Sequence, residues 1–560
     1  MASGTARERR VARRVDDGQR LRRLPLPVQV LVSGFVGPVE AASAKEAHGY
    51  ARLLSGLRIC MTLDLDASSL SQLGRYEGVT ELRLVSQKSA SAGVGMRVAA
   101  QLGEVLRTCK TIRKLELCRV SFKQGQMQKL ATGLAQSPSL CDLVLGSMCV
   151  VFPGSGGREL GSAIAGCPTL RSLDLSQSNI DDKITRDLLM ELARGHAALS
   201  RLDVSSIREH VVLSCEALKV LLEKTPTLLE LKLQCRGLKP SCAQTLLAGL
   251  AGNHSLRVLN LGKCNSLGDA LAEKIGHVLA KNRRLETLIL QRCNVGLDTA
   301  RNIAFGLVSN QTLTLLDLSH NERIRDGAGE ALGKALAVNT TLSHLNLTKC
   351  ALGNETARAL ASALKRQSRL KSLTLASNPR LGDTGAAALF VAIGECRTLS
   401  QLSLKGCGVN ELHNISNAIN GTSPLQKLHL GCTRLSNRGG QRLANALSSP
   451  ARLTELDLGA VKMSSLTLQV LFSALEHNSS LKKLNMSNVC DFDKNDAILV
   501  TLNRALVLNT TLRELDLRSC NFTTFSAEML CIALKSNRSL ETILVSFART
   551  MFDETVLRSS

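Results

Sequence analysis

Large aromatic side chains are almost missing from this sequence. There is no tryptophan in 560 residues, and Tyr50 and Tyr76 are the two tyrosines. A core must therefore be packed from aliphatic side chains, and the stacking platforms that single-stranded nucleic acids need are lacking. Long apolar runs are lacking too, because no stretch approaches the roughly 18 residues of a membrane-spanning helix. We expect no membrane span.

Motifs for catalysis and metal binding are also missing. The sequence has no CxxC pair, no Cys/His cluster at ligand spacing, no HExxH and no nucleophile elbow. The stretch most similar to a phosphate-binding loop, GAGEALGKA at 327–335, has Ala328 in place of the first glycine and Ala335 after the lysine. We therefore expect no enzyme activity, no cofactor and no metal.

A leucine pattern does run through most of the chain. Leu342, Leu345 and Leu347 form LxxLxL and are followed by Cys350, and the same frame returns about every 28 residues. Poorer copies begin at Cys60 and Val79, and the clear copies begin at 112, 140, 170, 199, 228, 256, 285, 313, 342, 370, 399, 425, 453, 481, 512 and 540. The pattern predicts about eighteen short strands.

Each copy predicts a strand, a turn, a helix and a second turn. Alternation along LxL sends the leucines into a core and the intervening residues outward. Asp269, Asp326, Asn354 and Asp383 are N-cap candidates for the helices that follow. One copy cannot bury its own apolar faces, so the copies must stack. We expect an α/β solenoid, a horseshoe with a parallel sheet on the concave face and helices on the convex face.

Two repeat types alternate in the middle of the chain. Spacings of 29 and 28 residues alternate from 199 to 399, and the residue after the strand is Cys293, Cys350 or Cys407 in one type and Asn321 or Asn378 in the other. The chain resembles the ribonuclease-inhibitor family over roughly 60–550, although Cys264 stands where that rule predicts asparagine. The resemblance implies a protein-binding scaffold. The cysteine usage indicates an intracellular, reducing location, cytoplasmic or cytoskeletal, with nuclear and organellar locations also open.

Asparagines and cysteines have structural interpretations. Asn253, Asn310 and Asn339 belong to N-x-S/T sequons three residues before a strand leucine. We interpret them as helix-end residues that tolerate the left-handed conformation, and not as glycosylation sites. We interpret the 18 cysteines as buried free thiols in a reducing compartment, because several occupy the turn position or precede strands.

The segment before the repeats differs in composition. Residues 1–23 hold eight arginines, and the weak apolar run LPVQVLVSGFVG follows them. A targeting segment is one interpretation. We favour a basic, partly disordered arm and cap over 1–59, followed by the solenoid at 60–550 and a C-terminal tail at 551–560.

Charge indicates where partners could bind. The formal net charge is +23 and the sequence pI is about 9.6. The central outward strand positions nevertheless hold seven acids and two bases, so we expect a concave face that is neutral to acidic and that does not attract phosphate backbones. The candidate partner-binding residues on that face are Asp174, Asp203, Asp317, His344, Asn346, His429, Asp457 and Asp516.

Basic residues gather at the beginning of the strands. The predicted basic rim consists of Arg113, Arg171, Arg257, Lys371, Lys482 and Arg513. Cations there would lie beside helix C-termini, where the helix dipole favours them. An acidic partner docking along this rim is the alternative interpretation.

Two functions of different class follow. The first is a non-enzymatic protein-binding scaffold, for example a structural subunit of a large intracellular assembly such as a ribosome or an axoneme. The second is a regulator of a small GTPase, as the Ran GTPase-activating proteins are, although the C-terminal sequence is not their acidic tail. A sensor array similar to that of NOD-like receptors is a third, but 1–59 is too short for their nucleotide switch. A GTP-hydrolysis assay separates the first two.

Overall fold

The computed structural model describes residues 24–31, 38–41, 57–62, 79–85, 96–145 without 121 and 123, 155–205 without 179, 181, 196 and 197, 215–489 without 235–237, 367 and 368, 496–547 without 523, and 556–557. The chain forms two compact units, Met1–Cys264 and Asn265–Ser560. Residues 1–23 of the predicted basic arm lie outside the described residues.

The first unit contains a parallel sheet that follows the chain order from β3 to β10, and β1 pairs antiparallel with β3 and with β2. Its strands are β1 (Leu24–Leu31), β2 (Pro38–Ala41), β3 (Leu57–Thr62), β4 (Val79–Val85), β5 (Lys114–Cys118), β6 (Asp142–Val144), β7 (Ser172–Asp174), β8 (Arg201–Asp203), β9 (Glu230–Lys232) and β10 (Val258–Asn260). Its helices are α4 (Met96–Thr108), α5 (Gln124–Ala135), α6 (Gly156–Gly166), α7 (Asp182–Arg194), α8 (Cys215–Lys224) and α9 (Pro240–Gly252).

The second unit repeats the arrangement from β11 to β20, and β21 pairs antiparallel with β20. Its strands are β11 (Thr287–Ile289), β12 (Leu315–Asp317), β13 (His344–Asn346), β14 (Ser372–Thr374), β15 (Gln401–Ser403), β16 (Lys427–His429), β17 (Glu455–Asp457), β18 (Lys483–Asn485), β19 (Glu514–Phe522), β20 (Thr542–Phe547) and β21 (Val556–Leu557). Its α-helices are α10 (Ala272–Lys281), α11 (Leu297–Ser309), α12 (Gly329–Val338), α13 (Asn354–Arg366), α14 (Gly382–Glu395), α15 (Ile415–Ile419), α16 (Asn437–Leu447), α17 (Ser465–His477), α18 (Asp496–Leu508) and α19 (Thr524–Ser536), and three short 3₁₀ helices precede α10, α12 and α14.

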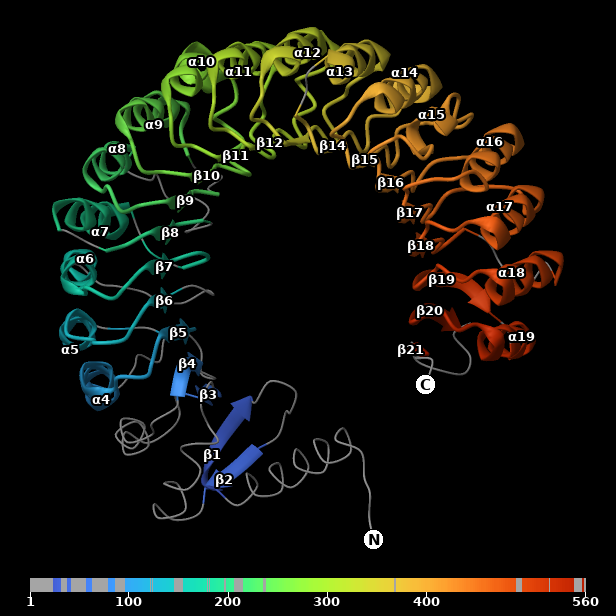
Figure 1. Ribbon diagram of the computed structural model, residues 1–560. Coiled ribbons are helices and arrows are strands. Elements are labelled where there is room, and N and C mark those ends of the chain that lie inside the picture. The colour runs from blue at the N-terminus through green and yellow to red at the C-terminus, as the bar shows by residue number, and fades with distance from the viewer. Residues whose placement is uncertain are drawn as a thin grey trace. The chain divides into compact units, whose positions relative to one another are not determined.

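In each unit the helices cover one face of the sheet and leave the other free (Figure 1). We call the free side the uncovered face. Every strand register that the leucine pattern predicts carries a strand, from β3 to β20. The prediction of an α/β leucine-rich-repeat solenoid is confirmed.

Strand alternation creates the two faces of the sheet. In β17 the side chain of Leu456 is buried, whereas Glu455 and Asp457 on either side are half-buried and point away from the core. Parallel register keeps the leucines in one line, since Leu456 is paired with Leu428 on one side and Leu484 on the other. The core is therefore a continuous ladder of aliphatic side chains, as the scarcity of aromatics predicts.

Buried asparagines at the helix ends tie each repeat to the one before it. The side-chain oxygen of Asn339 accepts hydrogen bonds from the backbone N–H groups of Thr341 (3.0 Å) and Leu342 (2.7 Å). Its amide nitrogen donates to the carbonyls of Leu307 (2.7 Å) and Asn310 (3.0 Å) in the preceding repeat. Asn253, Asn310, Asn478, Asn509 and Asn537 bond in the same way.

The asparagines are buried, which confirms their structural role. The predicted left-handed backbone conformation is wrong. Asn310 has φ −76° and Asn339 has φ −72°, so neither adopts the left-handed conformation. Asparagine is suited to the position because one side chain offers both an acceptor and donors to backbone groups that would otherwise be buried unpaired.

This asparagine series is interrupted around α15. The equivalent positions are occupied by Cys396, Thr422 and Pro450. In the repeat of α15, Ser423 instead donates to the carbonyl of Ala418, and Asn420 caps the turn. The helix there has 5 residues, whereas its neighbours α14 and α16 have 14 and 11.

The alternation of cysteine and asparagine after the strands has a similar cause. The side-chain oxygen of Asn378 accepts from the backbone N–H groups of Cys350 and Leu352 in the preceding repeat, each at 3.0 Å. The thiol of Cys350 donates in turn to the carbonyl of Leu318 one repeat earlier, at 3.2 Å. Burial raises the pKa of the Cys350 thiol to about 12.

Acidic residues that were predicted as N-caps act on the neighbouring repeat. Asp326 lies in a 3₁₀ helix before α12, and its Oδ1 accepts from the backbone N–H groups of Gly353 (3.0 Å) and Thr356 (2.8 Å) at the start of α13. Asp383 similarly accepts from Asn410 and Glu411 of the next repeat. Partial burial acts to raise the pKa of Asp326, but the hydrogen bonds from Thr356 and Gly353 outweigh it and lower that pKa.

Replacing Asn339 by alanine should lower the free energy of unfolding by about 2 to 4 kcal/mol, because two carbonyls and two N–H groups lose a buried partner. Chemical denaturation measures the change. Thr340→Ala, an exposed neighbour inside the same sequon, should change stability by less than about 0.5 kcal/mol. Equal effects of the two substitutions would contradict the structural role.

Asp326→Ala should lower the free energy of unfolding by about 1 to 2 kcal/mol at pH 7. Because the folded-state pKa of this carboxyl is lowered, its stabilisation is present above the ordinary pKa and is lost as pH falls through the lowered value. The stability difference between the wild type and Asp326→Ala should therefore shrink below about pH 4. A difference that stays constant from pH 7 to pH 3 would rule out an ionised cap.

Candidate functional site

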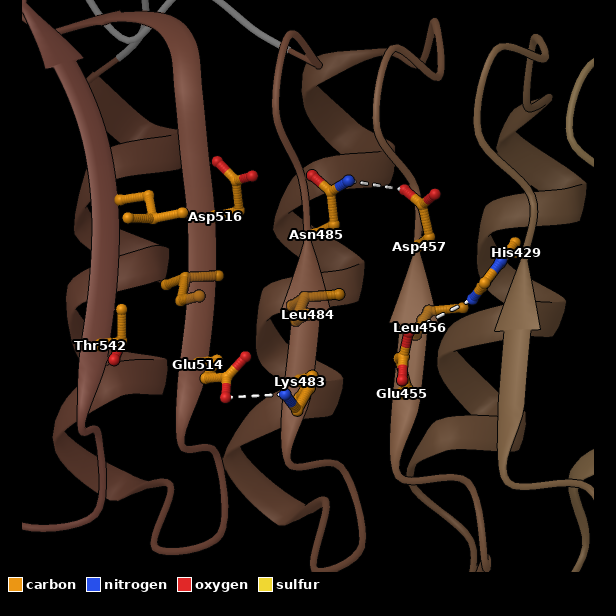
Figure 2. Close-up of a pocket in the computed structure, with 12 residues that line it drawn as sticks. His429, Glu455, Leu456, Asp457, Lys483, Leu484, Asn485, Glu514, Asp516 and Thr542 are labelled. Carbon is orange, nitrogen blue, oxygen red and sulfur yellow. Dashed lines mark hydrogen bonds and ion pairs between the residues drawn. The ribbon is translucent and has the colours of Figure 1, made fainter. Parts of the chain in front are cut away.

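The uncovered face is hollowed over the last strands of the second unit. A depression of about 260 Å³ lies across β16 to β20, with polar side chains along the strands (Figure 2). Leu544 of β20 is part of its lining. Its polar lining consists of His429, Glu455, Asp457, Lys483, Asn485, Glu514, Asp516 and Thr542. Three of the predicted residues on this face, His429, Asp457 and Asp516, line the depression.

The first outward positions of β16 to β19 alternate between a base and an acid. Lys427 contacts Glu455 at 2.8 Å, and Lys483 contacts Glu514 at 2.8 Å. The imidazole of His429 also lies 3.3 Å from Glu455 (Figure 2). Partial burial acts to raise the pKa of Glu455, but Lys427 and His429 outweigh it, so that its pKa is lowered and the carboxylate stays ionised at neutral pH.

The second outward position holds acids that are fixed by hydrogen bonds. Oδ1 of Asp457 accepts from the backbone N–H of Gly459 and from the amide of Asn485, both at 2.8 Å (Figure 2). Asp516 is held by Arg518, whose guanidinium lies 2.8 Å from Oδ2. These side chains are therefore preorganised before any ligand arrives.

The other candidate residues of the second unit lie on β12 and β13. The amide of Asn346 donates to Oδ2 of Asp317 at 3.1 Å, and Oδ1 of Asp317 accepts from the N–H of Ser319 at 2.8 Å. His344 is exposed at the first outward position of β13, where its Nδ1 lies 2.8 Å from the hydroxyl of Ser343. These residues share the uncovered face with Asp457 but do not line the depression.

In the first unit, Asp174 and Asp203 face each other on adjacent strands. They are register partners in β7 and β8, and each accepts a hydrogen bond from the N–H two residues later. Burial, together with the charge of Asp174, raises the pKa of Asp203. Lys232 lies 4.0 Å from Asp203 and balances part of the repulsion.

The predicted basic-rim residues are all exposed. Two of them bond backbone carbonyls at the same edge, since Arg171 donates to Pro168 (2.8 Å) and Arg513 donates to Ser539 (2.9 Å). Arg513 also lies 3.6 Å from Glu541. These contacts agree with the helix-dipole interpretation of the basic rim.

Sequence reasoning missed half of the charged lining. Glu455, Lys483 and Glu514 occupy the first outward position, two residues before the central position on which the prediction relied. Arg518 lies two residues after the central position. The sequence contained the information needed to find them. Side chains two residues apart on a strand point to the same face, so the outward position before the central one also belongs to the uncovered face.

The cysteine prediction needs two corrections. Cys432 and Cys531 are exposed and not buried. Cys215 at the start of α8 and Cys242 in α9 form a disulfide, with Cα atoms 5.1 Å apart. Spacing could not reveal it, because the pair depends on how two helices stack. Cys350, Cys407 and other turn cysteines are buried free thiols, as predicted. Among the described residues, no three His, Cys, Asp or Glu side chains gather in a way that could hold a metal ion.

No helix within the described part of the chain combines the length and apolarity needed to cross a bilayer.

Comparisons with known proteins agree with the repeat geometry. A family model described as Leucine Rich repeat matches residues 166–184, 252–276, 309–333, 338–361, 368–390 and 508–531. The ribonuclease inhibitor of Sus scrofa is 28% identical over 339 residues, which cover 55% of this chain and 74% of that protein. The NACHT, LRR and PYD domains-containing protein 5 of Bos taurus is 27% identical over 337 residues, which cover 58% of this chain and 27% of that protein.

A solved structure adds support for the fold. The crystal structure of the TLR13–ssRNA13 complex matches with a TM-score of 0.53 at 17% identity, over 87% of this chain and 62% of that chain. At this identity the match concerns the fold alone. The matched share of the bovine protein is its leucine-rich-repeat part.

Thiol reactivity should follow burial. At pH 8 iodoacetamide should modify the exposed Cys432 in the native protein. Cys350 and Cys407, with pKa values of about 12 and about 11, should react only after unfolding, because their thiolate fraction is negligible and they are inaccessible. Peptide mapping by mass spectrometry measures this. Native-state modification of Cys350 at the rate of Cys432 would contradict the buried turn.

Proposed function

Because the chain is a leucine-rich-repeat protein of the ribonuclease-inhibitor-like type, we propose that it is a non-enzymatic scaffold that binds a protein partner on the uncovered face and its adjacent loops. The observation that supports this most directly is the depression across β16 to β20, whose charged side chains are already held in place. A rigid polar surface of this kind forms many modest contacts with little ordering cost.

The partner on this face is a protein that presents basic and polar side chains. Around the depression, Glu455, Asp457, Glu514 and Asp516 outnumber the lining base Lys483. Glu455 and Glu514 already have lysine partners, so specificity depends on matching a pattern of alternating charge more than on net charge. The negative charges of Glu455, Asp457, Glu514 and Asp516 repel phosphate backbones from this face.

The exposed basic rim is the second part of the proposal. The chain has a net charge of +23, and the basic rim lies apart from the acids that line the depression. In this proposal the rim faces an acidic segment of the same assembly. We propose an intracellular, reducing compartment because twelve described cysteines are free thiols, and the Cys215–Cys242 pair would be reduced there. Such a compartment suits a subunit of a large intracellular assembly.

Affinity purification from native cells, followed by mass spectrometry, tests the proposal. Asp457→Lys combined with Asp516→Lys should release partners that the wild type retains, since like charges then meet across the interface. Asp174→Lys with Asp203→Lys tests the first unit in the same way. Lys371→Glu with Lys482→Glu tests the rim, and Glu330→Lys with Glu355→Lys, on the exposed helix side, is the matched control for charge reversal. An identical set of captured proteins from all variants would reject the uncovered face as the binding surface.

A further inference from the structure

The outer faces of the last helices expose several apolar side chains. Val500 on α18 and Phe525 and Ile532 on α19 are each 59% exposed, and Leu466 on α17 is 58% exposed. Val507 on α18 is also exposed. Contiguous exposed apolar side chains of this kind mark an interaction surface more often than scattered ones do.

Central helices of the same unit also expose apolar side chains, namely Phe305, Val308 and Val338, but these are interspersed with charged pairs. On α12, Glu330 pairs with Lys334 at 2.7 Å, and on α13 Glu355 pairs with Arg358 at 3.0 Å. The exposed Phe305 on α11 lies against the ring of His277. Charged pairs within one helix are typical of a surface that stays in water.

The charges on α19 are arranged in another way. Glu528 and Lys535 are exposed on the same side of the helix as Phe525 and Ile532, and within the described residues neither has an ion pair. They are two helical turns apart, about 10.5 Å along the axis, and are too distant to pair with each other. Both charges are therefore available to a partner outside the described part of the chain.

We propose that this face, formed by Val500 and Val507 of α18 and Phe525, Glu528, Ile532 and Lys535 of α19, is covered by the same face of a second copy of the chain. The two copies are related by a two-fold axis, and each helix runs antiparallel to its counterpart. We call this surface the C-terminal helix face.

The sequence of α19 is complementary to itself in that arrangement. If the two-fold axis passes between Cys531 and Ile532, Glu528 lies opposite Lys535 of the second copy and Phe525 lies opposite Arg538. The first contact is an ion pair and the second places a guanidinium near an aromatic ring. Both contacts occur twice, as an isologous interface requires.

The neighbouring helix is complementary about the same axis. Asn537 after α19 donates to the carbonyl of Asn509 after α18 at 3.2 Å, so the two helices end at the same height. The axis therefore crosses α18 near Arg504, where Val500 lies opposite Val507 of the second copy. Val500 and Val507 thus meet across the axis on α18, where Arg504 of each copy is paired with Glu476 of its own chain, while opposite charges meet on α19.

A membrane surface fits this face less well. Glu528 lies within the apolar stripe, where it would be repelled by anionic headgroups and would be costly to bury in lipid. Arg504, a further base on α18, already pairs with Glu476 at 3.2 Å. The charge pattern therefore favours a second copy.

Sedimentation velocity of the full chain over a range of concentrations tests the proposal. The wild type should show a concentration-dependent dimer. Glu528→Lys alone and Lys535→Glu alone should each weaken the dimer by roughly tenfold or more, because like charges then meet twice. The double variant Glu528→Lys with Lys535→Glu should recover most of the affinity, since the swapped charges again meet opposites.

Val500→Asp should abolish the dimer, whereas Val338→Asp on α12, which is also exposed, should leave it intact. Circular dichroism melting curves show whether each variant is folded, and the charge-swap rescue does not depend on Val500. A wild type that stays monomeric at about 100 µM would overturn the proposal. So would a dimer that the single charge reversals leave unchanged, or a monomer that floats with phosphatidylserine vesicles.

Discussion

Hydrogen bonding between successive repeats is the constraint on which the rest of this structure depends. A repeat of 28 or 29 residues buries helix-end carbonyls and turn N–H groups that it cannot satisfy alone. Asn339 and its equivalents satisfy them with one side chain that bonds its own turn and the preceding repeat. The leucine ladder supplies the apolar burial, but these amides fix the distance and height at which neighbours stack.

The same stacking determines where binding chemistry is available. Once the leucines of each strand face the helices, the residues on either side of them must face outward together. Asp457, Asn485 and Asp516 come from three repeats and still form one row, because parallel register aligns their central leucines. A site of this kind is formed by equivalent positions of successive strands, and no single repeat contains it.

Much of the fold was predictable from the sequence, because the leucine frame at 342, 345 and 347 fixes strand position and strand orientation at once. Less of the candidate site was predictable. Glu455 and Glu514 were not predicted because the prediction used only the central outward position of each strand. The role of Asp326 was assigned to its own helix, since a sequence does not show that its carboxylate reaches the first turn of the next one. The pairing of Cys215 with Cys242 likewise depends on how two helices stack.

The short helix α15 has a consequence for how the second unit responds to stress. Around it the asparagine amides are replaced by Cys396, Thr422 and Pro450, and the helix-side layer is reduced to 5 residues. In a linear array, cooperativity passes only between nearest neighbours, so a weak junction divides the array into blocks that open separately. Pulled from its two ends, the second unit would part at this junction first, leaving α10–α14 and α16–α19 as the segments that still hold.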